Sequence, residues 1–373
     1  MNEKPKPKFK KGKKVIKIIL LIFLGLIILF ALTIIIGRII NAQKYKISSD
    51  TGIQKSEYVT IGGIEQYIQI RGQDISNPVI IMLHGGPGSN MAYYSYYWQT
   101  DLEQDYTIVH WDQRGCGNTY YHNKEAKKPT LDLLLSDLDQ LVDYIRLEYD
   151  KEKVIVMGHS WGTFLGGIYS GEHPDKVSAY IGISQMLDFK KSEQVSAEEA
   201  IRLANKAGKT QDAQEIGEKL ELVMTFDKFD KPNVTEFMKF RELKDKYLPS
   251  GDSMSALEMV SLRLFSPYMT FNDLKWMLNF DKLIESNSEL YEALLSEGKL
   301  SMYDYNLQYE VPVIIIAGNC DWITPHSMAL NYFNDISAPN KKFITMENTG
   351  HIPFIDKPKE FSEALLKALG NVL

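Results

Sequence analysis

The feature that most constrains this chain is a short apolar segment that runs directly into the pattern Gly-x-Ser-x-Gly. Residues 154–157 are apolar and mostly β-branched, and small and apolar residues follow the pattern as far as position 169. That order predicts a strand, a tight turn and a helix, which is the setting of a nucleophile elbow. In such a turn Gly158 and Gly162 have no room for side chains, and the backbone of Ser160 is strained. We therefore predict that Ser160 is a nucleophile at the start of a helix, where free amides favour negative charge.

Composition limits the class of protein. The 373 residues are 44% hydrophobic, enough for one large domain with an insertion or for two small domains. The two cysteines, Cys116 and Cys320, exclude a disulfide scaffold and a cysteine-rich metal site, and we expect neither a metal nor another cofactor. Residues 38–373 carry 34 basic and 47 acidic side chains, a balance of −13, which argues against nucleic acid as a partner. The sequence does not specify an oligomeric state.

The first 37 residues differ from the rest in charge and in hydropathy. Residues 1–17 contain eight lysines and one acid, a balance of +7, and residues 18–37 contain no charged side chain. At about 1.5 Å per residue, a helix of that length spans the roughly 30 Å hydrocarbon core of a bilayer. A cleaved signal peptide has a shorter apolar region, and a buried core helix is seldom apolar on every side.

We therefore predict a basic cytoplasmic tail over residues 1–17 and an uncleaved transmembrane signal anchor over residues 18–37. Because lysines stay in the cytoplasm, the rest of the chain is expected on the outer side of the cell membrane. Residues 38–55 are expected to form a polar stalk between this single span and the body.

The body begins with two alternating segments, 57–61 and 64–70, which flank a Gly-Gly pair and predict an antiparallel hairpin. The alternation of strands and helices that follows predicts an α/β fold, a mostly parallel sheet with helices on both faces. The further strands are expected at 79–83, 106–111, 154–157, 177–184, 311–317 and 342–346, and the helices at 131–145, 163–169, 327–334 and 358–369.

This alternation is interrupted between residues 187 and 300. The segment has a helix-forming composition, no convincing strand and several prolines. It is too long for a structureless loop and predicts a helical cap inserted into the sheet. The body is thus divided into a first core part over 56–186, the cap over 187–300 and a second core part over 301–373. The cap helices are expected at 197–209, 214–224, 255–264, 271–283 and 288–296.

The second core part supplies two polar residues at strand ends. Asp321 follows the strand at 311–317, and His351 follows the strand at 342–346. Because the carboxyl ends of parallel strands meet at one edge of a sheet, both side chains are expected near Ser160. The order Ser, Asp, His is that of an α/β-hydrolase catalytic triad. We predict that His351 takes the proton of Ser160 and that Asp321 orients the imidazole and offsets its charge.

The tetrahedral intermediate of such a reaction needs amide donors for its oxyanion. The amide of Trp161, directly after the nucleophile, is one expected donor. The other is expected in the His-Gly-Gly-Pro-Gly loop after strand 79–83, from Gly85 first and Gly86 next, since glycines let the backbone approach a substrate closely. His159 is expected to point away from the site and to serve packing.

Two other groups of residues allow two interpretations each. The aromatic cluster at positions 93–98 either packs in the core or lines an apolar pocket. The cap acids Glu221, Glu236 and Glu258 either hold a substrate ammonium group or lie on solvated helix faces, and the solvated face is the commoner case.

Three motifs together resemble a known family. The loop 84–88, the segment 111–117 (Trp-Asp-Gln-Arg-Gly-Cys-Gly) and the Ser160-Trp161-Gly162 elbow, with a helical cap before the acid, resemble the proline iminopeptidase (prolyl aminopeptidase) family of α/β-hydrolase-fold serine hydrolases. The resemblance covers about residues 55–373. It implies an aminopeptidase that removes an N-terminal residue, often proline, from short peptides, with Ser160, Asp321 and His351 at the catalytic positions.

Two positions depart from the family pattern. His159 stands where members of the family usually have a small residue, and the acid loop reads Gly-Asn-Cys-Asp over 318–321. Many general esterases have histidine before the nucleophile, so an esterase or amidase acting on small acyl substrates is the alternative function. A non-catalytic surface binding protein is less favoured, because the triad and the oxyanion loop are complete in the sequence.

Overall fold

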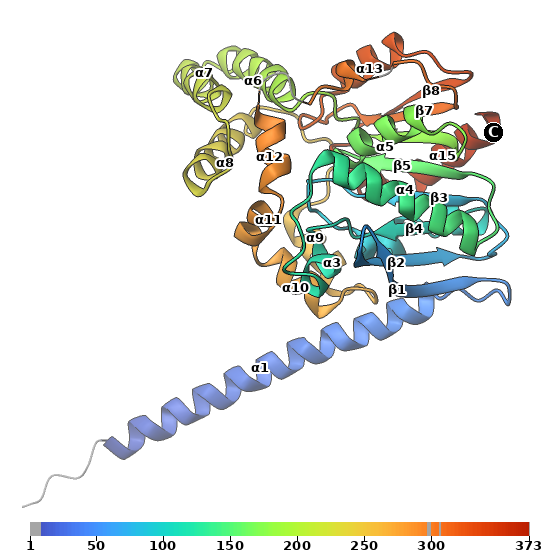
Figure 1. The fold of residues 1–373 in the computed structure, drawn as a ribbon. Helices are drawn as coiled ribbons and strands as arrows, with labels where there is room; N and C mark the ends of the chain where they lie inside the picture. The colour runs from blue at the N-terminus through green and yellow to red at the C-terminus, as the bar shows by residue number, and fades with distance from the viewer. Residues whose placement is uncertain (1–8, 297–299, 306, 373) are drawn as a thin grey trace, which may run out of the picture.

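The computed structural model describes residues 9–296, 300–305 and 307–372, and its central element is one eight-stranded sheet (Figure 1). The strands lie in the order β1-β2-β4-β3-β5-β6-β7-β8. β2 pairs antiparallel with β1 and with β4, whereas all other neighbours are parallel. The predicted α/β fold with a mostly parallel sheet is therefore confirmed. The strands are β1 Ile53–Ile61, β2 Ile64–Gly72, β3 Val79–Leu83, β4 Thr107–Trp111, β5 Val154–His159, β6 Val177–Ile183, β7 Val313–Gly318 and β8 Lys341–Met346.

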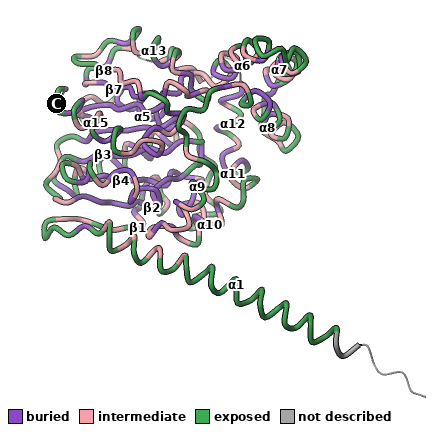
Figure 2. The backbone as a smooth tube through the Cα atoms, turned by 180° about the vertical axis from the view of Figure 1, so that it is seen from behind, coloured by how far each residue is buried: buried purple, intermediate pink, exposed green. Residues whose placement is uncertain are grey.

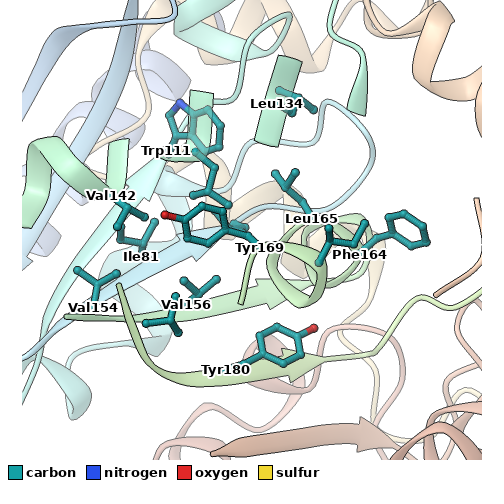
Figure 3. Close-up of a cluster of buried hydrophobic side chains, with 14 of the residues drawn as sticks. Ile81, Trp111, Leu134, Val142, Val154, Val156, Phe164, Leu165, Tyr169 and Tyr180 are labelled. Carbon is teal, nitrogen blue, oxygen red and sulfur yellow. The ribbon is translucent and has the colours of Figure 1, made fainter. Parts of the chain in front are cut away.

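Alternate residues of the central strands enter two separate cores, one on each face of the sheet. In β3, Ile81 and Leu83 belong to one core, and Ile80 and Met82 belong to the other. All four side chains are fully buried, which explains why this strand is an unbroken apolar run in the sequence. Figure 3 shows part of the first core, where side chains of the strands pack against aromatic rings of α5 (Trp161–Glu172).

Helices cover both faces of the sheet, as predicted. The first core includes side chains of α4 (Leu131–Glu148), α5 and α13 (His326–Asp335), and the second includes side chains of α2 (Ser95–Trp98) and α15 (Pro358–Val372). The remaining short helices of the core are α3 Gly117–His122 and α14 Pro353–Asp356, with 3₁₀ turns at Ala92–Tyr94, Leu102–Gln104 and Met302–Asp304.

Helices α6 to α12, called the cap helices below, are inserted between β6 and β7 and lie to one side of the sheet (Figure 1). α8 was not predicted, because Pro232 suggested a break. Proline fits the first turn of a helix, and Asp230 caps α8 by accepting a hydrogen bond from the amide of Asn233 (3.1 Å). The helix expected over 271–283 is two helices, because the side chain of Asn279 caps a new one. The bounds are α6 Phe189–Lys206, α7 Thr210–Met224, α8 Lys231–Asp245, α9 Ala256–Leu264, α10 Phe271–Met277, α11 Phe280–Ser286 and α12 Ser288–Leu295.

α1 (Phe9–Lys44) is a continuous helix that projects from the body, exposed along most of its length (Figures 1 and 2). Its segment Gly12–Lys44 is long and apolar enough to cross a membrane, and its most apolar part is not buried against the body. It contains the span predicted over 18–37. Residues 1–8 of the predicted basic tail lie outside the described residues.

Residues 38–55 do not form the separate stalk that we expected. α1 continues into this range, and β1 begins before its end. Arg38 Nε donates a hydrogen bond to the carbonyl oxygen of Leu264 (2.8 Å), and Asn41 Nδ2 donates one to that of Phe265 (2.9 Å). The polar side chains that suggested a solvated stalk thus hold α1 against the cap helices.

Candidate active site

Ser160 lies in the turn between β5 and α5. Its φ of 53° and ψ of −119° place a non-glycine residue in a strained region of backbone space. A Cβ atom on Gly158 would collide with the backbone of Gly162, and one on Gly162 would collide with the carbonyl of Leu83. The tight turn therefore requires both glycines, and it holds Ser160 at the N-terminus of α5.

His351 and Asp321 are in direct contact. Asp321 lies in the loop after β7 and His351 in the loop after β8, and Nδ1 of the imidazole is 2.9 Å from Oδ2 of the carboxylate. His351 and Ser160 line the same cavity. The structure thus brings the three predicted residues to one edge of the sheet, although the Ser160 hydroxyl makes no hydrogen bond to a residue of the described ranges.

The environment of Asp321 keeps it ionised. The side chain is buried, and its Oδ1 accepts hydrogen bonds from the amides of Ile323 (2.9 Å) and Thr324 (3.0 Å). Its Oδ2 accepts a hydrogen bond from the Thr324 hydroxyl (2.7 Å) in addition to the contact with His351. Burial by itself raises the pKa of a carboxyl, but the imidazole and these hydrogen bonds outweigh burial and hold the pKa of Asp321 below its ordinary value. An ionised Asp321 only accepts, so the proton between the two groups lies on Nδ1 of His351.

His159 does not point away from the site, contrary to our expectation. Its Nε2 is 2.8 Å from the carbonyl oxygen of His351, and the two imidazole centroids are 4.9 Å apart. The hydroxyl of Ser184 donates a hydrogen bond to the same carbonyl (2.9 Å). Burial, and next the neighbouring His351, lower the pKa of His159 to about 3, so its ring is neutral and donates from Nε2. The signal that could have revealed this role was the position of His159 at the carboxyl end of a central strand.

The expected oxyanion donors lie around Ser160. A Cβ atom on Gly85 would lie 3.1 Å from Cβ of Ser160, and both Gly85 and Gly86 line the cavity. Gly86 has a φ of 115°, which only glycine adopts easily. Within the described part of the chain, the amides of Gly85, Gly86 and Trp161 have no hydrogen-bond acceptor. These donors are therefore free to bind a substrate oxygen.

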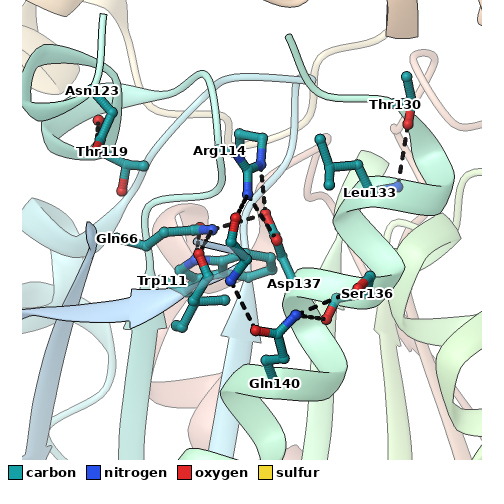
Figure 4. A network of polar contacts seen from close by, with 12 residues as sticks. Gln66, Trp111, Arg114, Thr119, Asn123, Thr130, Leu133, Ser136, Asp137 and Gln140 are labelled. Atoms are coloured by element: carbon teal, nitrogen blue, oxygen red, sulfur yellow. Dashed lines mark hydrogen bonds and ion pairs between the residues drawn. The ribbon is translucent and has the colours of Figure 1, made fainter. Parts of the chain in front are cut away.

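The Asp-Gln-Arg-Gly motif holds this loop in place, a role that the sequence analysis missed. Gln113 donates hydrogen bonds from its amide to Nε2 of His84 and from its side chain to the carbonyl of His84, both at 3.2 Å. Its side-chain oxygen accepts a hydrogen bond from Nε1 of Trp161 (3.3 Å). Next to it, Arg114 forms a buried ion pair with Asp137 (2.8 Å; Figure 4). Gln113 thus links the glycine loop to the residue after the nucleophile.

The cavity lined by Ser160 has a volume of about 440 Å³ and walls made mostly of aromatic and apolar side chains. All four side chains Tyr93, Tyr94, Tyr96 and Trp98 pack in the second core, and Tyr93 and Tyr94 also line the cavity, so both interpretations of the aromatic cluster hold in part. Among the described lining residues there is no carboxylate. The acids Glu221, Glu236 and Glu258 lie on helix surfaces outside the cavity, Glu236 half-buried and the other two exposed.

Among the residues that the structure describes, two arginines are the charged side chains in the cavity wall. Arg241 forms an ion pair with the buried carboxylate of Glu193. Arg263 donates a hydrogen bond to the hydroxyl of Tyr94 and has no ion pair with a described residue. The cavity therefore presents uncompensated positive charge and apolar surface to a bound molecule.

The fold and the geometry of this site can now be compared with those of known proteins. Residues 78–358 match the model of the alpha/beta hydrolase fold family, so the chain belongs to that family.

Relatives with known names support the narrower resemblance. The chain is 27% identical over 322 residues to the probable aminopeptidase YbaC of Bacillus subtilis (strain 168), covering 82% of this chain and 93% of that protein. It is 27% identical over 307 residues to the proline iminopeptidase of Heyndrickxia coagulans, covering 79% of this chain and 90% of that protein. The predicted resemblance to proline iminopeptidases is thereby confirmed.

Two solved structures share the fold. A membrane phospholipase A described as a bacterial virulence factor has a TM-score of 0.58 and 16% identity, covering 97% of this chain and 99% of its own. A proline iminopeptidase-related protein from Thermus thermophilus has a TM-score of 0.57 and 18% identity, covering 86% of this chain and 98% of its own. At these identities the likeness concerns the fold alone.

Proposed function

We propose that this chain is a serine hydrolase in which Ser160, His351 and Asp321 form the catalytic triad. The observation that carries the proposal is the strained Ser160 at the head of α5, on the wall of a cavity that His351 also lines, with His351 bonded to a buried carboxylate. A serine hydroxyl is a weak nucleophile near neutral pH and needs an adjacent base, which this arrangement supplies.

The reaction proceeds through an acyl-enzyme. Oγ of Ser160 attacks the substrate carbonyl carbon, and its proton passes to Nε2 of His351. The amides of Gly85 or Gly86 and of Trp161 bind the oxyanion of the tetrahedral intermediate. His351 then gives the proton to the leaving group, and the bond between the carbonyl carbon and that group breaks. Water, deprotonated by His351, releases the acyl group from Ser160 in a second addition and elimination.

The substrate class that the named relatives favour is a short peptide with a free N-terminus. In that reaction the N-terminal residue, proline or another small one, is the acyl group, and the rest of the peptide leaves as an amine. The cavity of about 440 Å³ and its aromatic walls suit a small apolar residue.

An esterase or amidase of small acyl substrates is the second candidate, and one observation favours it. A free-amine substrate needs a negatively charged partner for its ammonium group, but the described cavity lining contains Arg241 and Arg263 and no carboxylate. This lining suits neutral or anionic acyl groups.

A panel of fluorogenic substrates tests both candidates. The full-length protein in detergent micelles is offered prolyl, alanyl and leucyl arylamides, each with and without an N-terminal block, together with short-chain esters. Turnover of the free-amine arylamides, abolished by the block, supports the aminopeptidase, whereas hydrolysis of esters alone supports the second candidate. The Ser160→Ala variant is the blank for every substrate.

A non-catalytic binding protein is tested in the same preparation. A fluorophosphonate probe labels an activated serine, and we expect label on the native protein and none on Ser160→Ala. An unlabelled native protein that is inert toward the whole panel would overturn the hydrolase proposal.

α1 is proposed to be a membrane anchor, with the body on the outer side of the cell membrane. The uncharged run over residues 18–37 has the length of a span, and the lysines before it favour the cytoplasmic side. Protease added to intact cells should then digest the body and leave a membrane-bound N-terminal fragment. Digestion only after cell lysis would contradict this orientation.

A further inference from the structure

The cap helices nearest to α1 expose a group of large apolar side chains. Leu257 is 76% exposed, Phe271 73% and Leu278 74%. The name cap apolar face is used below for these three side chains together with Val260 and Phe280, which are less exposed. Leu257 and Val260 are one turn apart on α9, and Phe271 and Leu278 are two turns apart, so each pair lies on one side of its helix. Concentrated exposure of this kind marks an interaction surface.

The contacts of α1 fix where this face lies relative to the anchor. Arg38 donates hydrogen bonds to the carbonyl oxygens of Leu264 (2.8 Å) and Met269 (3.2 Å), and Gly37 packs against the ring of Phe265. Leu264 is the last residue of α9, and α10 begins at Phe271. The junction between the two helices is therefore level with the end of the uncharged run over 18–37.

If α1 spans the bilayer, the end of the uncharged run over 18–37 marks the boundary between the hydrocarbon core and the headgroups. A twenty-residue apolar helix matches the hydrocarbon core, so the residue that follows it, Arg38, lies among the lipid headgroups. The junction bonded to Arg38 lies at the same depth. α9 and α10 extend from it with their apolar side chains exposed, and Figure 1 shows α1 leaving the body on the side of α10.

We propose that the cap apolar face inserts into the outer surface of the bilayer. The inference rests on the proposed anchoring by α1. Apolar insertion fits better than charge attraction, because the body carries a net charge of −13 outside residues 1–37. The ammonium of Lys275 lies 5.0 Å from the ring centroid of Phe271 and 4.3 Å from that of Tyr121, which places one positive charge beside the face for lipid phosphates.

The same helices also form a wall of the candidate active site, which gives the inference a consequence for the proposed hydrolase. α9 carries Met259 and Arg263 into the cavity, and α11 contributes Phe280, which belongs both to the cavity lining and to the cap apolar face. The cavity thus adjoins the membrane surface. The substrate class is narrowed to peptides, esters or amides with an apolar portion that partitions into lipid.

Site-specific fluorescent probes test the insertion in the full-length protein. In a Cys320→Ser background, where Cys116 is buried, single variants Leu257→Cys, Phe271→Cys and Leu278→Cys receive a polarity-sensitive label and enter phosphatidylcholine/phosphatidylglycerol vesicles with brominated chains. We expect quenching at all three positions. Leu147→Cys on α4 is the matched control, since Leu147 is 87% exposed but outside the cap, and Leu26→Cys reports on the span.

The outcomes separate the inference from the anchoring on which it rests. Quenching at Leu26 with none at the three cap positions overturns the insertion alone, whereas no quenching at Leu26 overturns the anchoring and the insertion together. Shielding of the cap probes that follows protein concentration instead of lipid bromination assigns the face to a second copy of the chain and also overturns the proposal.

A kinetic comparison tests the substrate class. The double variant Leu257→Ser/Phe271→Ser should lose at least about fivefold in kcat/KM for a long-chain ester in vesicles and keep its rate on a soluble short-chain ester. Equal rates on the long-chain ester in both proteins overturn the substrate class. If the panel selects free-amine arylamides instead of esters, the same comparison is made with a lipid-anchored and a soluble arylamide. Inactivity of both proteins on all of these substrates, without fluorophosphonate labelling, is instead a failure of the proposed hydrolase.

Discussion

At the scale of single residues, Asp321 is expected to control the tautomer of His351. Asp321→Asn keeps the size of a buried side chain. Its amide oxygen can still accept from the amides of Ile323 and Thr324, so its NH2 donor faces Nδ1 and the imidazole loses the acceptor that keeps its proton there. We expect kcat to fall about 10⁴-fold, as for other triads that lose their carboxylate, with KM little changed. Steady-state kinetics on the best panel substrate measure this loss, and a fall of less than about tenfold would remove Asp321 from the triad.

His159 gives a second prediction at this scale. His159→Ala removes one of the two donors to the carbonyl of His351 and leaves that of Ser184. A net hydrogen bond contributes about 1 kcal/mol, so we expect kcat to fall about fivefold to tenfold with an unchanged KM. Ser184→Ala is the matched variant, and the double variant should lose more than the two separate effects combined. A raised KM with a constant kcat would show that His159 contacts substrate instead.

The site residues that could be predicted are those that a short stretch of sequence identifies by itself. Ser160, Asp321 and His351 each stand at the end of an apolar strand, and strand ends share one edge of a parallel sheet. His159 and Gln113 also stand at or just after strand ends, but that signal does not identify their partners. Their roles depend on how loops distant in sequence meet, the loop of His351 in one case and those of His84 and Trp161 in the other.

At the scale of elements, a carboxyl pair joins the cap to the core. Asp112, after β4, and Asp273, in α10, share the side-chain amides of Asn90 and Asn118 at 2.7–3.3 Å. Burial first, and the second carboxyl next, raise the pKa of Asp112 to about 8, and burial raises that of Asp273. The folded pKa exceeds the unfolded one, so this stabilisation is complete below about pH 4 and is lost as the pH rises through about 8.

We therefore expect α10 to loosen between pH 7 and pH 9. Hydrogen exchange of residues 270–280 should become faster over this range, relative to α4, after correction for intrinsic exchange. Asp273→Asn removes the second charge and should make the change smaller, whereas burial of Asp112 remains. A native protein whose α10 exchanges at a pH-independent corrected rate would contradict the prediction.

Element boundaries in the cap were less predictable than those in the core. Apolar strands are easy to recognise because both faces of the sheet are covered, as in β3 and β7. The cap helices depend on caps and first turns, and two were misread: Pro232 lies in the first turn of α8, and Asn279 is the N-cap of α11. The stalk was misread because the use of Arg38 and Asn41 depends on the distant junction between α9 and α10.

At the scale of the whole molecule, three buried histidines are expected to make the fold sensitive to mild acid. Burial lowers the pKa of His84 to about 4 and the pKa values of His110 and His159 to about 3. Each takes up a proton near pH 6.5 in the unfolded chain but not in the folded one, so the free energy of unfolding falls as the pH drops from about 6.5 to 4. Asp112 binds a proton in the folded state over the same pH range. It therefore offsets the effect of one histidine on the free energy of unfolding.

Each of these buried histidines by itself contributes about one proton to the difference, which corresponds to a loss of roughly 1.4 kcal/mol per pH unit near pH 5. Thermal unfolding of the full-length protein in detergent should therefore show a Tm that falls steeply between pH 6.5 and 4.5. His110→Gln keeps a polar partner for Gln99 and removes one of the groups that resist protonation in the fold. The fall in Tm should therefore be shallower by the contribution of about one proton. An unchanged slope in His110→Gln would mean that His110 is protonated in the fold, which its buried position between Trp98 and Gln99 and next to Arg71 opposes.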